Sequence, residues 1–210
     1  MNDPLLLALH ESRQLGFLGP GPVEAHVQHA LAFADLAISS PARALDLGAG
    51  GGLPGLVLAM LVWPETAWTF LDSQQRRTAF LQEASEALGI SERVQVVTGR
   101  AEDVCRLLDF RGSYDLVVAR SFGAPAVTAE CAAPLLRAGG SLIVSEPPAT
   151  ESERWPADGL SVLDLVVSES VVVSSDGSTE PVHLVRLERG ELELDRYPRR
   201  VGIPAKRPIF

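Results

Sequence analysis

Short apolar runs alternate with amphipathic runs along the middle of the chain, and this alternation constrains the fold more than any other feature. The runs that suit strands cover residues 42–47, 66–72, 93–99, 114–120 and 141–145. The runs between them that suit helices cover residues 54–62, 74–89, 102–108 and 125–136. Strands that alternate with helices at this spacing form a parallel sheet with helices on both faces, so the sequence predicts an α/β fold.

The pattern changes on either side of this alternating region. Two runs of helical periodicity, residues 2–18 and 22–38, precede it. Two strand-like runs, residues 160–173 and 180–189, follow it and are separated by a turn-like segment at 174–178. Such a pair favours an antiparallel hairpin at the end of an otherwise parallel sheet. We therefore expect a mostly parallel seven-stranded sheet with a C-terminal antiparallel hairpin and two N-terminal helices.

A glycine-rich loop follows the first predicted strand. Five glycines lie within the eight positions 48–55. Glycine has no Cβ, so the backbone N–H groups of such a loop can approach a ligand closely. Ligands of open α/β sheets bind just beyond the carboxyl ends of the strands, where this loop is expected. The loop is therefore the predicted cofactor site.

The sequence of this loop matches the binding motifs of two different cofactors. Gly50-x-Gly52-x-x-Gly55 matches the dinucleotide fingerprint, and Asp72 stands about 20 residues further on, as that fingerprint requires. Asp46-x-Gly48-x-Gly50 instead matches the usual first motif of S-adenosylmethionine methyltransferases. Asp46 would repel a pyrophosphate but would attract the ammonium group of S-adenosylmethionine. The charge at this position favours S-adenosylmethionine over a nicotinamide dinucleotide.

Charged residues also stand at the ends of the next three predicted strands. Asp72 can accept hydrogen bonds from ribose hydroxyls, or it can cap the following helix. Glu102 lies where an adenine would be read, although it also suits the first turn of a helix. Arg120 can face the cofactor or the substrate, or it can form an ion pair with one of those two acids.

The charges are distributed unevenly along the chain. The sequence has 18 basic and 27 acidic residues, for a net charge of −9, which disfavours a strong global attraction to nucleic acid. Five of the basic residues, Arg196, Arg199, Arg200, Lys206 and Arg207, lie within residues 196–207, which contain no acid. Any contact with RNA is therefore expected to be confined to a small basic surface, and it should be sensitive to salt.

We expect one domain over residues 1–210, made of N-terminal helices (1–40), a cofactor-binding core (41–190) and a basic tail (191–210). The acidic stretch 149–158 is expected to be a surface connection. Two cysteines, without zinc-type spacing, predict neither a disulfide framework nor a metal site. With no membrane-length apolar run and no positively charged leader, these features predict a cytoplasmic protein.

Several segments together resemble one known family. LDLGAGGGLPGLVLA, FLDSQQRRTAFL, GRAED and DLVVARSFG are similar to motifs of the bacterial ribosomal RNA small subunit methyltransferase G family, also called glucose-inhibited division protein B. The closing RYPRRVGIPAKRPIF is similar to the tail of that family. The resemblance covers nearly the whole chain. The Gly-Leu-Pro-Gly extension of the loop and the tail are its specific parts.

The resemblance implies a Rossmann-like class I methyltransferase that uses S-adenosylmethionine to methylate N7 of one guanine in 16S ribosomal RNA, free or in a precursor of the small subunit. By motif position, the family's cofactor contacts fall on Gly48, Leu53, Ala101, Glu102 and Arg120. Contacts general to the fold fall on Asp46, Gly50 and Asp72. Arg120 would also position the base or a phosphate. Arg199, Arg200, Lys206 and Arg207 would hold RNA phosphates, unless the tail is a solvated terminus.

The chemistry agrees with what the sequence lacks. It contains no convincing nucleophile–base pair, and guanine N7 needs none because its lone pair is free. The enzyme must only align the reacting atoms and exclude water. The chain departs from the family after the fifth predicted strand, where Ser145-Glu146-Pro147-Pro148 stands in place of Leu-Lys-Gly. A diverged enzyme that methylates a small molecule, or a protein that only binds cofactor or RNA, therefore remains an alternative.

Overall fold

A seven-stranded sheet forms the centre of the molecule in the computed structural model, which describes residues 3–148, 154–174 and 181–210. The strand order is β3-β2-β1-β4-β5-β7-β6. The strands are β1 (Arg43–Leu47), β2 (Ala67–Asp72), β3 (Val94–Thr98), β4 (Tyr114–Arg120), β5 (Leu136–Glu146), β6 (Leu165–Val173) and β7 (Val182–Arg189). Strands β1 to β5 are parallel, and β7 is antiparallel to both of its neighbours. The predicted fold class is confirmed.

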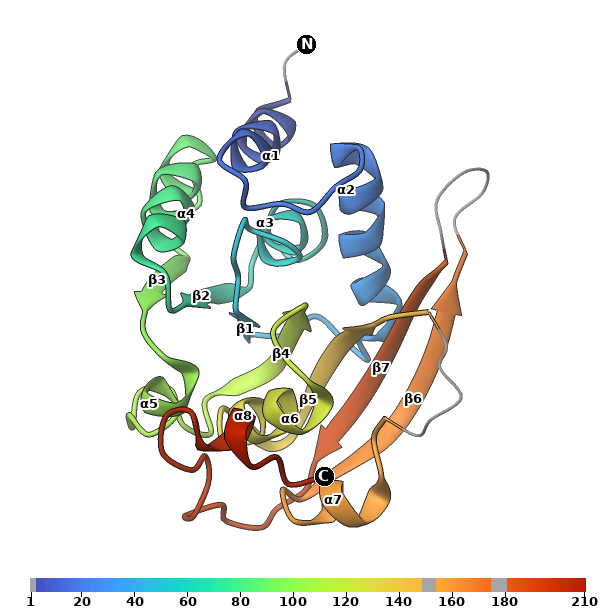
Figure 1. The fold of residues 1–210 in the computed structure, drawn as a ribbon. Coiled ribbons are helices and arrows are strands. Elements are labelled where there is room, and N and C mark those ends of the chain that lie inside the picture. Colours follow the sequence, from blue (N-terminus) through green and yellow to red (C-terminus); the bar gives the residue numbers. More distant parts are fainter. Residues whose placement is uncertain (1–2, 149–153, 175–180) are drawn as a thin grey trace.

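Helices cover both faces of the sheet (Figure 1). One face carries α1 (Pro4–Gln14), α2 (Val23–Leu31), the 3₁₀ turn η1 (Ala32–Leu36), α3 (Gly55–Val57) with its π-helical continuation η2 (Leu58–Val62), and α4 (Gln75–Ala87). The other face carries α5 (Ala101–Val104), α6 (Pro125–Ala132), α7 (Ala157–Ser161) and α8 (Ile203–Lys206). The two predicted N-terminal helices are α1 and α2.

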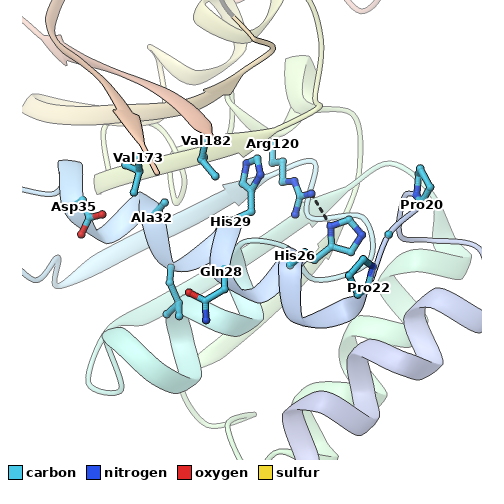
Figure 2. A pocket seen from close by; sticks show the side chains of 13 residues that line it. Pro20, Pro22, His26, Gln28, His29, Ala32, Asp35, Arg120, Val173 and Val182 are labelled. Carbon is cyan, nitrogen blue, oxygen red and sulfur yellow. Dashed lines mark hydrogen bonds between the residues drawn. The ribbon is translucent and has the colours of Figure 1, made fainter. Parts of the chain in front are cut away.

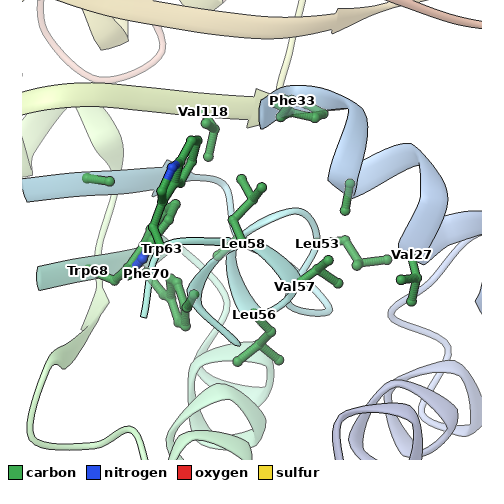
Figure 3. Packing of buried hydrophobic residues seen from close by; sticks show 14 of the residues in the cluster. Val27, Phe33, Leu53, Leu56, Val57, Leu58, Trp63, Trp68, Phe70 and Val118 are labelled. Atoms are coloured by element: carbon green, nitrogen blue, oxygen red, sulfur yellow. The ribbon is translucent and has the colours of Figure 1, made fainter. Parts of the chain in front are cut away.

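Alternate residues of each strand enter two separate hydrophobic cores. In β4, Leu116 and Val118 pack on the α2 and α3 side, whereas Val117 faces the α5 and α6 side. This alternation is the two-residue period of a strand that is buried on both faces. On the α3 side, Trp63 stacks on Trp68 with 6.2 Å between ring centroids (Figure 3). The two cores hold the glycine loop between rigid elements.

Several predicted element boundaries are wrong. The helices expected at 2–18 and 102–108 end at Gln14 and Val104. The helix expected at 125–136 ends at Ala132, because Pro134 has no N–H group to continue the helical hydrogen bonds. Residues from Leu136 instead begin β5, with a bulge at its start. The strand expected from residue 160 begins only at Leu165, after α7 and a left-handed Asp164.

Two predicted connections lie largely outside the described residues: the acidic connection 149–158 up to residue 153, and the turn at 174–178 beyond Ser174.

The order of the parallel strands places a switch point between β1 and β4. Connections leave β1 toward β2 on one side, and β4 lies on its other side. The loops after β1 and β4 therefore open a crevice at the carboxyl ends of these strands. Within the described ranges, no helix is long and apolar enough to cross a membrane, and no cluster of three or more metal-ligating side chains occurs.

Candidate functional site

The glycine loop after β1 is shaped by left-handed backbone and by its neighbouring strand. Gly48, Gly50 and Gly52 have φ values of 76°, 53° and 94°, which glycine adopts at little cost. The N–H groups of Gly48 and Ala49 donate to the carbonyl of Leu71 at 2.8 and 2.9 Å. A Cβ on Gly48 would lie 2.7 Å from the Phe122 ring. The loop thus requires glycine both for its backbone angles and for its close contacts.

Asp46 lies beneath this loop with no exposed surface. Its Oδ2 accepts a hydrogen bond from the Gly55 N–H at 2.7 Å, and its Oδ1 has no partner among the described residues. Burial raises the pKa of Asp46 to about 7, and the charge of Asp72 acts in the same direction. Asp46 thus anchors the loop through Gly55, and its expected attraction to a cofactor ammonium stays a prediction.

Asp72 makes two backbone contacts, and binding of ribose hydroxyls by its carboxylate stays a prediction. Its Oδ1 accepts from the backbone N–H of Gln74 at 2.8 Å, in the turn that leads into α4. Its Oδ2 accepts from the Gly50 N–H at 3.0 Å and lies 3.5 Å from Arg77. The carboxylate also lines a cavity, so it links the glycine loop, α4 and the open site.

Glu102 lies at the start of α5 and is almost wholly buried. Its Oε1 accepts from Arg100 at 3.2 Å and from the backbone N–H of Gly202 at 3.0 Å. Burial alone would raise the pKa of Glu102, but the hydrogen bonds from Gly202 and Arg100 bring it below its ordinary value. The basic tail therefore completes the surroundings of this acid.

A cavity of about 440 Å³ opens beside these two acids. Its walls include Asp72, Ala101, Glu102, Phe122, Val127 and Ala205. A second cavity of about 210 Å³ continues over the loop from Gly48 to Gly51, past Leu53, to Arg120. The two cavities share Gly48, Arg77 and Ser121. Together they form an elongated site with acids at one end and a cation at the other.

Arg120 at the end of β4 points toward α2 (Figure 2). Its Nη2 donates to Nδ1 of His26 at 2.9 Å, which leaves Nε2 of His26 to donate to the carbonyl of Gly19 at 3.2 Å. The Nη1 atom of Arg120 is buried and has no partner in the described part of the chain. Among the described residues Arg120 pairs with neither Asp72 nor Glu102, and its side chain lines the second cavity, where a cation suits an anionic group.

A third and larger cavity, of about 750 Å³, lies between α2 and the ends of β6 and β7 (Figure 2). His26, His29 and Arg120 form its inner wall. His29 donates to or accepts from the Ser145 hydroxyl at 2.8 Å, which ties α2 to β5. Burial, with the charges of Arg120 and His26, lowers the pKa of His29 to about 4.

The basic tail packs against the body of the protein. Arg199 donates from Nε and Nη2 to the two carboxylate oxygens of Glu130 at 2.9 and 2.6 Å, and Glu130 is fully buried. Arg111 donates to the carbonyls of Leu194 and Tyr197. Of the four predicted RNA contacts, Arg199 is therefore engaged within the protein. Arg200, Lys206 and Arg207 are exposed.

Sequence reasoning missed several residues of the site. His26 and His29 could have been found, because a spacing of three places both on one face of a helix. Ser121 has a left-handed φ of 57°, which is uncommon for a residue with a Cβ and often marks a functional position, but no sequence signal announces it. Ala205 reaches the first cavity only through the path of the tail.

The sheet topology and the glycine loop after β1 define the class I methyltransferase fold. The chain belongs to the ribosomal RNA small subunit methyltransferase G family, whose model matches residues 22–177. It is 34% identical over 180 residues to ribosomal RNA small subunit methyltransferase G of Moorella thermoacetica, covering 85% of this chain and 74% of the relative.

Solved structures share the fold at low sequence identity. The O-methyltransferase of Bacillus cereus in complex with SAH superposes with a TM-score of 0.60 at 15% identity, covering 90% of this chain and 92% of that one. The [4+2]-cyclase SpnF superposes with a TM-score of 0.61 at 16% identity, covering 79% and 81%. Because a cyclase shares this fold, the architecture alone does not define the reaction.

Proposed function

We propose that the protein transfers a methyl group from S-adenosylmethionine to N7 of a guanine in 16S ribosomal RNA. The single observation that carries the cofactor half is the pair of adjoining cavities, with Asp72 and Glu102 lining the first and Arg120 lining the second. The RNA half is supported by membership of the family. Since its substrate would be the small ribosomal subunit or its precursor, the enzyme would work in the cytoplasm.

The residues of the elongated site fit the parts of S-adenosylmethionine. The Asp72 carboxylate suits ribose hydroxyls, and Ala101 with Glu102 suits an adenine. Gly48, Gly50 and Leu53 would lie along the methionine part, and Arg120 suits its carboxylate. Asp46 lies beneath the glycine loop and holds it in place by accepting a hydrogen bond from the Gly55 N–H. When bound, this cofactor supplies an electrophilic methyl group on a positively charged sulfur.

The protein's task in such a transfer is alignment and the exclusion of water. The N7 lone pair of guanine forms the new N–C bond as the C–S bond breaks, so no proton leaves the base and no general base is required. The positive charge moves from sulfur to the guanine ring. Leu53 and Phe122 border the cavities and would keep water from the reacting atoms. Arg120 would fix the donor relative to the acceptor.

RNA would meet the protein along the exposed basic part of the tail. Lys206 and Arg207 directly follow Ala205, which lines the first cavity, so these charges lie beside the mouth of the cofactor site. They suit phosphate groups near the reacting base. Arg199 contacts Glu130 and is therefore less available for this role than its exposed neighbours.

The test maps N7-methylguanine in 16S ribosomal RNA from the host with and without the gene, alongside calorimetry of S-adenosylmethionine binding to the purified protein. We expect one guanine to lose its methyl group in the deletion strain and to regain it when small subunits are incubated with protein and cofactor. Absence of cofactor binding would contradict the whole proposal. Cofactor binding with an unchanged methylation map would contradict only the acceptor.

A small-molecule acceptor is the second candidate, and the acid Glu146 at the site is the observation that favours it. Neutralising Arg200, Lys206 and Arg207 together separates the two. An RNA enzyme should lose affinity for small subunits and show a weaker salt dependence, because these charges release counterions from RNA. A small-molecule enzyme should keep its activity on its acceptor.

A further inference from the structure

A fourth cavity, of about 330 Å³, lies at the ends of β4 and β5 and is absorbed by neither the cofactor site nor the tail. Its volume falls within the range of about 300–1,000 Å³ that is typical of small-ligand sites. It is lined by residues of four segments: His29 of α2, Ser121 and Phe122 after β4, Thr128 of α6, and Glu146 of β5. Arg154 and Trp155 close its outer side.

The position of this cavity identifies what it can hold. Ser121 lines both cofactor cavities and also this fourth cavity, so the three spaces meet at one residue. Ser121 is also the residue held in left-handed backbone directly after β4. A methyl acceptor must touch the donor in line with its reacting bond, so it must occupy a space that opens on the middle of the cofactor site. The 750 Å³ cavity beside α2 does not include Ser121 among its walls.

The polar groups of the fourth cavity are arranged around one acid. The carboxylate of Glu146 forms an ion pair with Arg154, and the Glu146 side chain is only 13% exposed. Next to it, Ser145 is held by His29 at 2.8 Å. Trp155 is buried, and its Nε1 atom has no partner in the described residues. The site thus offers a fixed carboxylate and a flat apolar surface.

We propose that this cavity receives the acceptor base and that Glu146 recognises a guanine by accepting hydrogen bonds from its N1–H and N2–H groups. The inference rests on the proposed function. Guanine alone among the four RNA bases presents two adjacent donors on its Watson–Crick edge, and an ionised carboxylate only accepts. Sequence-specific RNA recognition commonly reads this edge of an unstacked base beside an aromatic side chain.

The same carboxylate contributes to the transfer itself. Arg120 pairs with Ser145 in the sheet register, so Ser121 and Glu146 follow on neighbouring strands. A base lying across the two strand ends can present N7 at Ser121 while its donor edge meets Glu146. As N7 forms its bond to carbon, the ring gains positive charge and its N–H groups become stronger donors. A negative acceptor at position 146 therefore binds the transition state more tightly than the ground state.

The experiment compares the unaltered protein, Glu146→Gln and the control Glu83→Gln on small-subunit RNA that carries guanosine or inosine at the mapped position. Glu83 lies on the exposed side of α4, away from the cavity. Inosine keeps N1–H but lacks the 2-amino group. Because a good bidentate contact discriminates by about tenfold or more, the unaltered protein and Glu83→Gln should lose about that factor in kcat/KM on inosine.

Glu146→Gln should lose a similar factor on guanosine, chiefly in kcat, and should lose little more on inosine. Its melting temperature and its calorimetric affinity for cofactor should match the unaltered protein, which separates recognition of the base from a folding defect. The assignment would be overturned if Glu146→Gln kept full activity on guanosine RNA. It would also be overturned if inosine lowered the kcat/KM of Glu146→Gln by as much as it lowers that of the unaltered protein. An unaltered protein that ignores the inosine change would overturn it as well. If the unaltered protein methylates no guanosine RNA while binding cofactor, the proposed acceptor fails, and this assignment fails with it.

Discussion

Some residues of the site connect several parts of the structure, and this is clearest for Asp72 and Glu102. Asp72 fixes the turn before α4 through Gln74 and also holds Gly50, and Glu102 receives hydrogen bonds from both its neighbour Arg100 and the distant Gly202. The sequence indicated the acids and their places at strand ends. It could not indicate their partners, because those depend on how the loop and the tail return to the sheet.

His29 provides a test of the buried polar layer between α2 and β5. Its pKa is lowered to about 4 in the folded protein, against about 6.5 for an unperturbed histidine. Above pH 6.5 the imidazole is neutral in both states and contributes no pH dependence. Between pH 6.5 and 4 the unfolded chain binds a proton that the folded chain refuses, so stability falls as the pH falls.

Replacing His29 by Gln should therefore flatten the acid side of the stability curve. The amide keeps a polar partner for Ser145 and cannot titrate. From urea unfolding at pH 7 and pH 4.5, we expect the variant to lose less stability over this interval than the unaltered protein, by on the order of 2 kcal/mol. His10→Gln on the exposed side of α1 is the matched control and should leave the slope unchanged. Equal slopes for all three proteins would contradict the prediction.

At the scale of elements, the glycine loop, β1 and β2 behave as one unit. Gly55 begins α3 directly over Asp46, and a Cβ there would lie 2.6 Å from Asp46 Oδ2 and 2.6 Å from the Phe70 ring. Neither neighbour can move easily, since both are fully buried. The close packing of α3 on β1 and β2 therefore depends on the lack of a side chain at Gly55.

Gly55→Ala should accordingly weaken both the fold and the site. Overpacking of this kind costs about 1–3 kcal/mol, and the displaced loop should also reduce the affinity for S-adenosylmethionine. Denaturant unfolding and calorimetry measure the two effects. Gly19→Ala provides the comparison for stability, because a Cβ at Gly19 meets no heavy atom within 4 Å. A fully stable Gly55→Ala variant would show that the contact is not as tight as described.

The elements themselves were largely predictable, and the errors have local causes. The central strands β1, β2 and β4 follow from apolar runs that are buried on both faces, whereas β6 is mostly exposed and follows from its β-branched residues. The start of β5 was missed because Arg137, Gly139 and Gly140 read as a helix stop rather than as strand residues. The hydrogen bond between Arg120 and His26 could not be predicted from the sequence, because it depends on how α2 lies relative to β4.

At the scale of the whole molecule, the basic tail stabilises the fold and is also a candidate RNA surface. Arg199 joins it to Glu130 on α6 through a bidentate contact, and hydrogen bonding to Glu130 raises the pKa of Arg199. Charge counting grouped Arg199 with its neighbours as RNA contacts. The buried acid it neutralises lies 69 residues away in sequence, and no local pattern pairs the two.

Loss of the contact between Arg199 and Glu130 should lower the free energy of unfolding even in the absence of RNA. Arg199→Ala leaves the buried Glu130 without its charged partner and with only the backbone N–H of residue 199 as a donor, and loss of a buried ion-pair partner typically costs about 3–5 kcal/mol. Arg200→Ala, at an exposed neighbour, should change stability by less than about 0.5 kcal/mol. Thermal unfolding in the absence of RNA makes the comparison. Similar melting temperatures for the two variants would refute a structural role for Arg199.

The hydrogen bond from Gly202 to Glu102 also sets an order of events during synthesis. The ribosome adds Glu102 one hundred residues before Gly202, and Ala205, part of the cavity wall, comes later still. A growing chain that already has its glycine loop, its sheet and both acids still has an open cavity and a buried acid without its backbone donor. We therefore expect the cavity wall to be complete only once the last residues of the tail have joined the fold.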